Sequence, residues 1–212
     1  MSPDTSRKLI GSELSINPNY KGEINDHAIQ NASCPPWKNC SVHVEGFSPY
    51  ESRKEMLSIA RHARVAALNR NDPHPPRFPM AASGFTFFDR TSAQNFMQLG
   101  LLGMVSAHGY PLTFRWNKNK VRPATREEYR QSRTLLIEGP GKMISREKIL
   151  NILADNLTFN LVDSEEIYVE NERTLIRLEF IQIRGQSRPA MKCICVYVHT
   201  KRLVSLTVDY AF

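Results

Sequence analysis

Residues 83–90 read SGFTFFDR, with the alternation that is typical of a β-strand. Phe85 and Phe87 are two positions apart and therefore share one face of such a strand. Thr86 and Phe88 share the opposite face, so this segment has a large apolar side chain on each side. We expect a strand with a pair of phenylalanines on one face.

The flanking segments alternate between strand and helix patterns over about 80 residues. The segments 40–47, 65–68 and 112–116 have strand patterns, and the two regions between 48 and 64 and between 93 and 101 have apolar residues at helical spacing. A loop with four prolines, 69–79, follows the second strand. The order strand, helix, strand, strand, helix, strand predicts a ferredoxin-like βαββαβ sandwich.

The second half repeats this order after a charged segment. Strand patterns occupy 134–139, 166–169, 174–183 and 204–210, and a helix pattern occupies 145–157. Residues 188–199 suit a helix or a strand, and we favour a helix because 204–210 then supplies the closing strand. The predicted fold class is α+β, with two ferredoxin-like sandwiches, each an antiparallel four-stranded sheet with two helices on one face. The expected parts are a flexible leader (1–37), a first domain (38–118), a linker (119–132) with a capped turn at 125–128, and a second domain (133–212).

Two strand segments of the first half form a recognisable pair of motifs. Residues 42–47, VHVEGF, and residues 83–90, SGFTFFDR, resemble the hexamer and the octamer of the RNA recognition motif (RRM) family. The resemblance implies that His43, Phe85 and Phe87 lie on an open sheet face where unstacked bases stack. The octamer departs from the family pattern at three positions, which hold Ser83, Thr86 and Arg90.

The second half resembles the same family with degenerate motifs. Residues 135–140 stand against the hexamer and 173–180 against the octamer, with Leu175 and Arg177 in place of the stacking rings. Without those rings, base stacking loses its main energetic contribution. This domain is therefore expected to serve packing, protein contact or phosphate contact, the last through Arg133, Arg173, Arg177 and Arg184.

The charge of the chain favours a polyanionic partner. Its 212 residues include 28 Lys or Arg and 21 Asp or Glu, for a formal net charge of +7. Thr113 and Arg115 share a face of the fourth strand, and cations follow it, so a basic rim is expected beside the sheet. The predicted RNA-binding residues are His43, Phe85, Phe87, Thr113, Arg115, Lys118, Lys120 and Arg77.

Several other classes of function lack support in the sequence. The longest mainly apolar run, 96–105, is far shorter than the ~20 residues of a membrane helix, and no secretory signal is visible. The four cysteines lack zinc-site spacing, so no metal or cofactor is expected. No nucleophile, base or paired-carboxylate pattern indicates an enzyme. We expect an intracellular protein, nuclear or cytoplasmic.

The resemblance and the charge together predict non-enzymatic binding of single-stranded RNA through the first domain. The second domain would support or extend that surface, with a possible protein partner of its own. The alternative is a protein-interaction scaffold whose sheet faces are covered. Exposure of Phe85 and Phe87 distinguishes the two hypotheses, because a base stacks only on an accessible ring.

Overall fold

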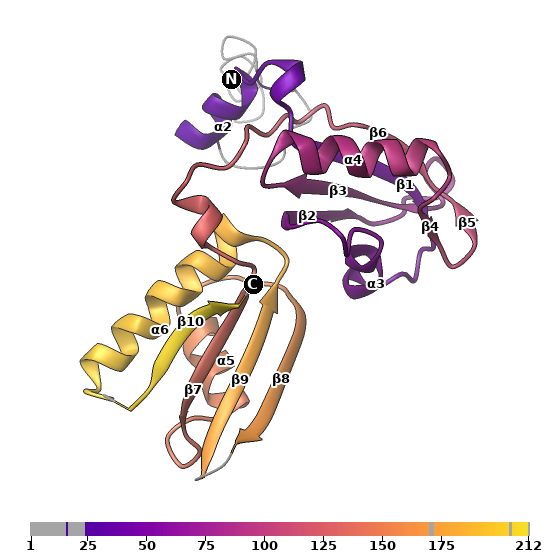
Figure 1. Cartoon of the computed structure of the whole chain (residues 1–212). Coiled ribbons are helices and arrows are strands. Elements are labelled where there is room, and N and C mark those ends of the chain that lie inside the picture. Colours follow the sequence, from indigo (N-terminus) through magenta and orange to yellow (C-terminus); the bar gives the residue numbers. More distant parts are fainter. Residues whose placement is uncertain (1–15, 17–23, 170–171, 204, 212) are drawn as a thin grey trace, which may run out of the picture. The chain divides into compact units, whose positions relative to one another are not determined.

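Two units of similar design make up the computed structural model of the chain, Met1–Ala124 and Thr125–Phe212 (Figure 1). The structure describes residue 16 and residues 24–169, 172–203 and 205–211. Most of the expected leader therefore lies outside the described residues.

The first unit contains one four-stranded antiparallel sheet in the order β2-β3-β1-β6. Its main elements are β1 (Ser41–Phe47), α3 (Arg53–Ser58), β2 (Val65–Asn71), β3 (Ala81–Phe87), α4 (Arg90–Leu101) and β6 (Thr113–Trp116). A short hairpin of β4 (Ser106–Ala107) and β5 (Tyr110–Pro111) precedes β6. This connectivity and strand order confirm the predicted ferredoxin-like arrangement.

Polar caps set where the helices of the first unit begin. The Ser52 hydroxyl accepts a hydrogen bond from the Glu55 amide at 3.2 Å, and the Glu55 carboxylate accepts one from the Ser52 amide at 2.7 Å. This capping box starts α3. The Asp89 carboxylate accepts from the Ser92 amide at 2.7 Å and starts α4.

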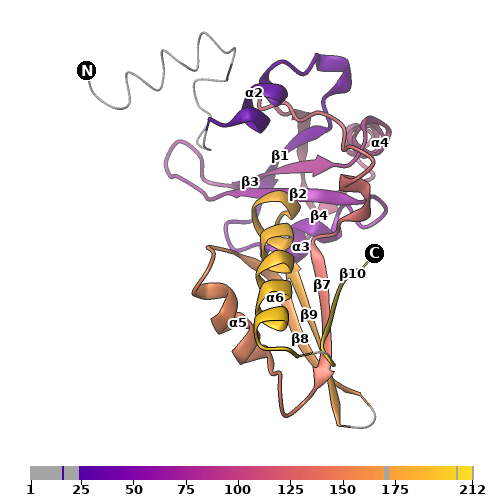
Figure 2. The same cartoon turned by 90° about the vertical axis from the view of Figure 1, so that its left-hand side faces the viewer.

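The second unit repeats the order with a sheet β10-β7-β9-β8, also antiparallel. Its elements are β7 (Thr134–Pro140), α5 (Arg146–Ala154), β8 (Leu161–Val169), β9 (Arg173–Phe180), the π-helical turn η3 (Ile183–Ser187), α6 (Arg188–Thr200) and β10 (Thr207–Ala211). The helix favoured for 188–199 is confirmed as α6. Figure 2 shows α5 and α6 on one side of this sheet.

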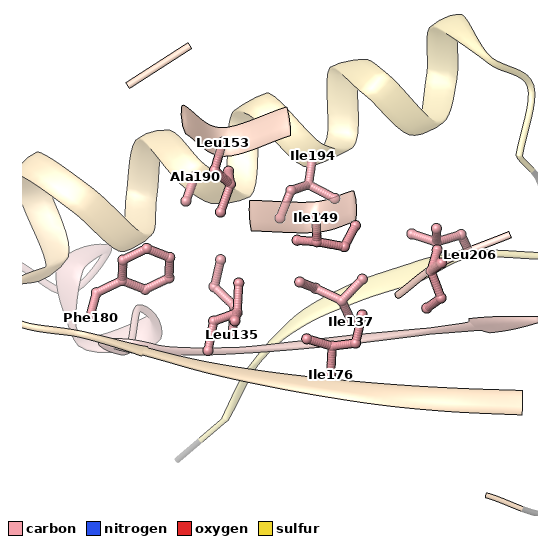
Figure 3. Packing of buried hydrophobic residues seen from close by; sticks show 11 residues of the cluster. Leu135, Ile137, Ile149, Leu153, Ile176, Phe180, Ala190, Ile194 and Leu206 are labelled. Carbon is pink, nitrogen blue, oxygen red and sulfur yellow. The ribbon is translucent and has the colours of Figure 1, made fainter. Parts of the chain in front are cut away.

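The core of the second unit lies between that sheet and its two helices. Leu135, Ile137 and Ile176 point from the strands toward Ile149 of α5 and Ile194 of α6, and all five are fully buried (Figure 3). Alternate residues of β7 and β9 are buried, as the period-two pattern of a half-covered sheet requires. No helix in the described part of this unit covers the opposite side of the sheet.

Two segments near the domain boundaries differ from or refine the expectation. The expected flexible leader, 1–37, contains α2 (Asp26–Ala32) and most of a 3-10 turn, η1 (Pro36–Lys38). The turn predicted at 125–128 is present: Thr125 and Glu128 hydrogen-bond each other's backbone amides and precede η2 (Glu128–Arg130). Among the described residues, no helix is long and apolar enough to span a membrane.

Candidate nucleic-acid interface

The two phenylalanines of the octamer lie in the core of the first unit. Phe85 is 0% exposed and Phe87 is 1% exposed. The Phe96 ring of α4 packs against both, with centroids 5.2 Å from Phe85 and 5.1 Å from Phe87. The prediction that these rings lie on the open sheet face is wrong, because both point toward the helices.

The strand register explains this correction. Val42 lies opposite Phe85 across β1 and β3, so the two residues share a face, and Val42 is also fully buried. The period-two pattern identifies which residues share a face, but it does not identify which face meets the helices. Burial alone does not distinguish the two faces either, because Phe88, which alternates with Phe87, is also buried. The open-face positions of β3 are therefore Ala82, Gly84 and Thr86, which offer no ring for stacking.

The open face of the first sheet does hold three of the predicted site residues. His43 lies opposite Arg115, and Glu45 lies opposite Thr113, across β1 and β6. A His43 ring nitrogen, Nε2, lies 3.1 Å from Glu45 Oε1, and the Arg115 guanidinium donates to the same carboxylate oxygen. Burial lowers the pKa of His43 below its ordinary value of 6.5, although the hydrogen bond to Glu45 opposes this shift. These four side chains form a polar row across β1 and β6, in which the Glu45 carboxylate partly neutralises the charge of Arg115.

The middle of this open face is small and polar. A Cβ added at Gly84 would lie 3.0 Å from the Asn117 side-chain nitrogen, so the Asn117 amide sits close above the backbone of β3. No Phe, Tyr or Trp occupies an open-face position of β2, β3, β1 or β6. On these four strands, the imidazole of His43 is the ring that the open face offers to a base.

One buried asparagine joins the chain before β1 to the chain after β6. The Asn39 side-chain oxygen accepts from the amides of Ser41 and Val121, at 3.0 and 3.1 Å. Its side-chain nitrogen donates to the Asn117 carbonyl at 3.0 Å. The Cys40 amide also donates to the Val121 carbonyl at 2.8 Å. These bonds hold the η1 segment beside the segment 117–122.

Cations gather where these two segments meet. Burial raises the pKa of the Cys34 thiol above its ordinary value of 9.0, and nearby positive charges oppose that rise. Those charges, which we call the basic cluster, belong to Lys120, Lys38, Arg90 and Arg122. Lys118, another predicted site residue, is exposed on the same segment as Lys120. The predicted basic rim is therefore centred on the end of the sheet where β1 begins.

An exposed tryptophan adjoins the basic cluster. Trp37 lies in η1, directly before Lys38, and is 71% exposed. The second tryptophan, Trp116, is covered by the Arg90 guanidinium at 3.5 Å from its ring centroid. Trp37 thus presents an accessible aromatic face beside cations, which is the combination that binds unpaired bases.

Arg77 lies away from the basic cluster, in the loop between β2 and β3. That loop is closed by two backbone hydrogen bonds between His74 and Phe78, at 2.7 and 3.0 Å, and Arg77 stacks on the exposed Phe78 ring at 5.2 Å. Because β3 starts just after this loop, Arg77 lies at the opposite end of the strands from Lys120. Arg70 donates to the carbonyls of Pro49 and Glu51, so its guanidinium holds the backbone.

The arginines of the second unit are engaged by carboxylates. Arg133 lies 3.1 Å from Glu179, Arg173 lies 2.6 Å from Glu138, and Arg184 contacts Glu128. Arg177 is flanked by three carboxylates, those of Glu179, Asp163 and Glu165. Such pairing weakens the attraction of each cation for phosphate.

Among the described residues, no group of three or more His, Cys, Asp or Glu side chains is placed to hold a metal ion. His108 approaches Glu51 and Glu55 at 3.6 and 3.4 Å, which is an ion-pair geometry between the β4–β5 hairpin and α3.

Comparisons with known proteins find similar solved structures at low sequence identity. No family model matches the chain, and no curated protein matches it. The Sex-lethal RNA recognition domains 1 and 2 from Drosophila melanogaster align over 82% of this chain and 100% of theirs, with 12% identity and a TM-score of 0.30. The first two RRM domains of yeast poly(U) binding protein cover 81% of this chain and 99% of theirs, with 10% identity and a TM-score of 0.32.

A candidate glycine cleavage system transcriptional repressor is also similar, over 81% of this chain and 98% of its own, with 10% identity and a TM-score of 0.27. The fold assignment rests on the strand order and connectivity of each unit.

Sequence reasoning missed Trp37, because the whole segment 1–37 was interpreted as a leader, and it assigned no role to Lys38 at the start of the first domain. One local signal was present: Pro35-Pro36 directly precedes Trp37, and proline favours the first turn of a helix. The position of η1 beside the segment 117–122 depends on long-range hydrogen bonds of Asn39, which no sequence pattern indicates.

Proposed function

We propose that the first unit binds single-stranded RNA at the basic cluster and Trp37, with the polar row of His43, Thr113 and Arg115 as an adjoining surface. The observation that carries this proposal is the exposed Trp37 ring, which directly precedes Lys38 of the basic cluster. Lys118 and Arg122 extend the positive region along the same segment. The proposal contains no catalytic step and no cofactor.

The energetics favour a ligand with both phosphates and accessible bases. Each phosphate neutralised by a lysine or arginine releases counterions, so binding weakens as the salt concentration rises. A base stacked on Trp37 would add about 1–3 kcal/mol. Duplex RNA hides its base faces and would gain only the first of these contributions.

Fluorescence anisotropy of a labelled, mixed-sequence single-stranded RNA tests the proposal. Trp37→Ala should weaken binding by about 5- to 100-fold, the loss of one stacking contact. The matched control is Tyr50→Ala, because Tyr50 is 94% exposed and follows the opposite end of β1. The contribution of charge is tested with Lys118→Ala/Lys120→Ala, which should reduce the salt dependence of RNA affinity. The control Lys192→Ala/Lys201→Ala, in and just after α6 of the second unit, should leave that dependence unchanged. Equal binding by all variants would refute the proposed site.

A second candidate function, protein docking, is favoured at the second unit. The described residues of its sheet face away from α5 and α6 include no aromatic ring, and Arg173 and Arg177 are both paired with carboxylates. RNA gains neither stacking nor free cations on such a surface. This face therefore suits a protein ligand better than a nucleic acid.

A further inference from the structure

The open face of the second sheet carries an apolar stripe across three strands. Ile167 of β8 lies opposite Leu175 of β9, and Leu136 of β7 lies diagonal to Leu175. Ile167 is 45% exposed, and the two leucines are half-buried. These side chains point away from the core, because the buried residues of β7 and β9 are the alternate ones. A partner that covered this stripe would remove apolar surface from water, which favours binding.

Carboxylates border the stripe on both sides. Glu165 lies two residues before Ile167, on the same face of β8, and Glu138 of β7 lies opposite Leu175. Asp209 of β10 lies opposite Leu136, is exposed and has no ion-pair partner among the described residues. The face and its margin together hold five carboxylates and three guanidinium groups, a net charge of minus two within a chain of net charge +7. The five acids are Asp163, Glu165, Glu179, Glu138 and Asp209.

We infer that this face docks a basic, partly apolar segment of a partner protein, in which lysine or arginine alternates with large aliphatic residues. An extended segment with that alternation can place its apolar side chains on Leu136, Leu175 and Ile167 and its cations beside Glu165 and Asp209. The inference rests on the second candidate function above and names the chemistry of its ligand.

Two other occupants fit the face less well. A second copy of the same face would bring like charges together, which costs free energy at an interface. Nucleic acid would meet the same negative border without a ring to stack on. Complementary charge therefore favours a basic segment.

The test uses three synthetic peptides of equal length with the full chain, measured by isothermal titration calorimetry. Their sequences alternate Lys with Leu, Lys with Ser and Glu with Leu. The Lys–Leu peptide should bind at least about tenfold more tightly than either of the others, because only it matches both apolar surface and charge. Leu175→Thr/Ile167→Thr should weaken it at least about tenfold, since β-branched threonine retains strand propensity without the apolar surface.

Matched variants separate docking on this face from general adhesion. Val196→Thr removes an equally apolar side chain, 65% exposed, from α6 and should leave peptide binding unchanged. Glu165→Gln/Asp209→Asn should weaken the Lys–Leu peptide about threefold or more, whereas Glu147→Gln on α5 should not. Circular dichroism confirms that each variant is folded before binding is measured.

The outcomes distinguish the ligand chemistry from the docking function. Tighter binding of the Glu–Leu peptide, reduced by Leu175→Thr/Ile167→Thr, would preserve docking and overturn the basic ligand. If the Lys–Ser peptide bound as tightly as the Lys–Leu peptide, charge alone would explain binding, and the role of the apolar stripe would be overturned. No binding of any peptide near 1 mM would overturn both the inference and the docking function. RNA binding at Trp37 should be the same in all of these variants, so it is tested separately.

Discussion

The rings of Phe85 and Phe96 pack 5.2 Å apart, between β3 and α4 of the first unit. Phe96 also contacts Phe87 at 5.1 Å and Phe114 at 5.4 Å, so one helical ring joins β3 to β6. The octamer that resembles an RNA-binding motif therefore supplies the core of the sandwich. Its aromatic residues stabilise the fold, and the ring that we propose for base stacking is Trp37, outside the sheet.

Phe85→Ala should destabilise the first unit by about 3–5 kcal/mol, because it removes a fully buried ring and leaves a cavity beside Phe96. The control Phe78→Ala, at a ring 53% exposed, should change stability by less than about 1 kcal/mol. Urea unfolding followed by circular dichroism measures both. Similar stability of the two variants would contradict the assignment of Phe85 to the core.

Gly100 of α4 lies against the Phe114 ring, and a Cβ there would be 2.4 Å from the ring carbon Cγ. Gly100→Ala should destabilise by about 1–3 kcal/mol, since overpacking outweighs the ~1 kcal/mol gain in helix propensity. Gln98→Ala, an exposed site on the same helix, should have little effect. Adding Phe114→Leu to Gly100→Ala should recover part of the loss, and an additive double mutant would argue against this contact.

Asn39→Ala should both destabilise the first unit and weaken RNA binding. It removes three hydrogen bonds and leaves the amides of Ser41 and Val121 without their acceptor, at about 1–3 kcal/mol for each buried group. Asn39→Asp keeps that acceptor and should cost less. Thermal unfolding and RNA anisotropy are compared for the two variants. Unchanged RNA affinity in folded Asn39→Ala would contradict its role in holding η1 beside Lys120.

Acidic pH should destabilise the first unit through His43. Its pKa is lowered in the folded state by burial, so the unfolded chain binds the proton more readily. The stabilising contribution of neutral His43 is present above the unfolded pKa of about 6.5 and declines as the pH falls below that value toward the lower folded pKa. The free energy of unfolding of His43→Gln should accordingly fall less between pH 7 and pH 5 than that of wild type. An equal fall in the free energy of unfolding of both proteins would contradict the contribution of His43 to acid destabilisation.

The fold could be predicted from sequence because each unit combines local patterns that agree with one topology. The amphipathic spacing near Ile149 and the alternation around Ile137 indicate α5 and β7 without any distant contact. The capping residues Ser52 and Thr125 also mark their turns locally. Consistency among these signals is what specifies the sandwich.

The candidate site was less accessible to sequence reasoning, because exposure is a property of the assembled layers. The alternation around Phe85 gives two sets of side chains, and only the packing of Phe96 identifies the covered set. Likewise, the position of Trp37 depends on bonds from Asn39 to residues about 80 positions away. By contrast, Lys118 and Lys120 could be placed near the edge of the sheet from sequence, because they directly follow its last strand in the chain; their contact with RNA stays a prediction.

The most direct measurement is the fluorescence of Trp37 during titration with single-stranded RNA. The chain has two tryptophans, so Trp116→Phe leaves Trp37 as the only emitting indole. We predict that RNA quenches this emission with the same midpoint as the anisotropy of the labelled RNA, and that higher salt shifts both midpoints together. Saturating anisotropy with unchanged Trp37 emission would contradict the account, because RNA would then bind without touching the ring.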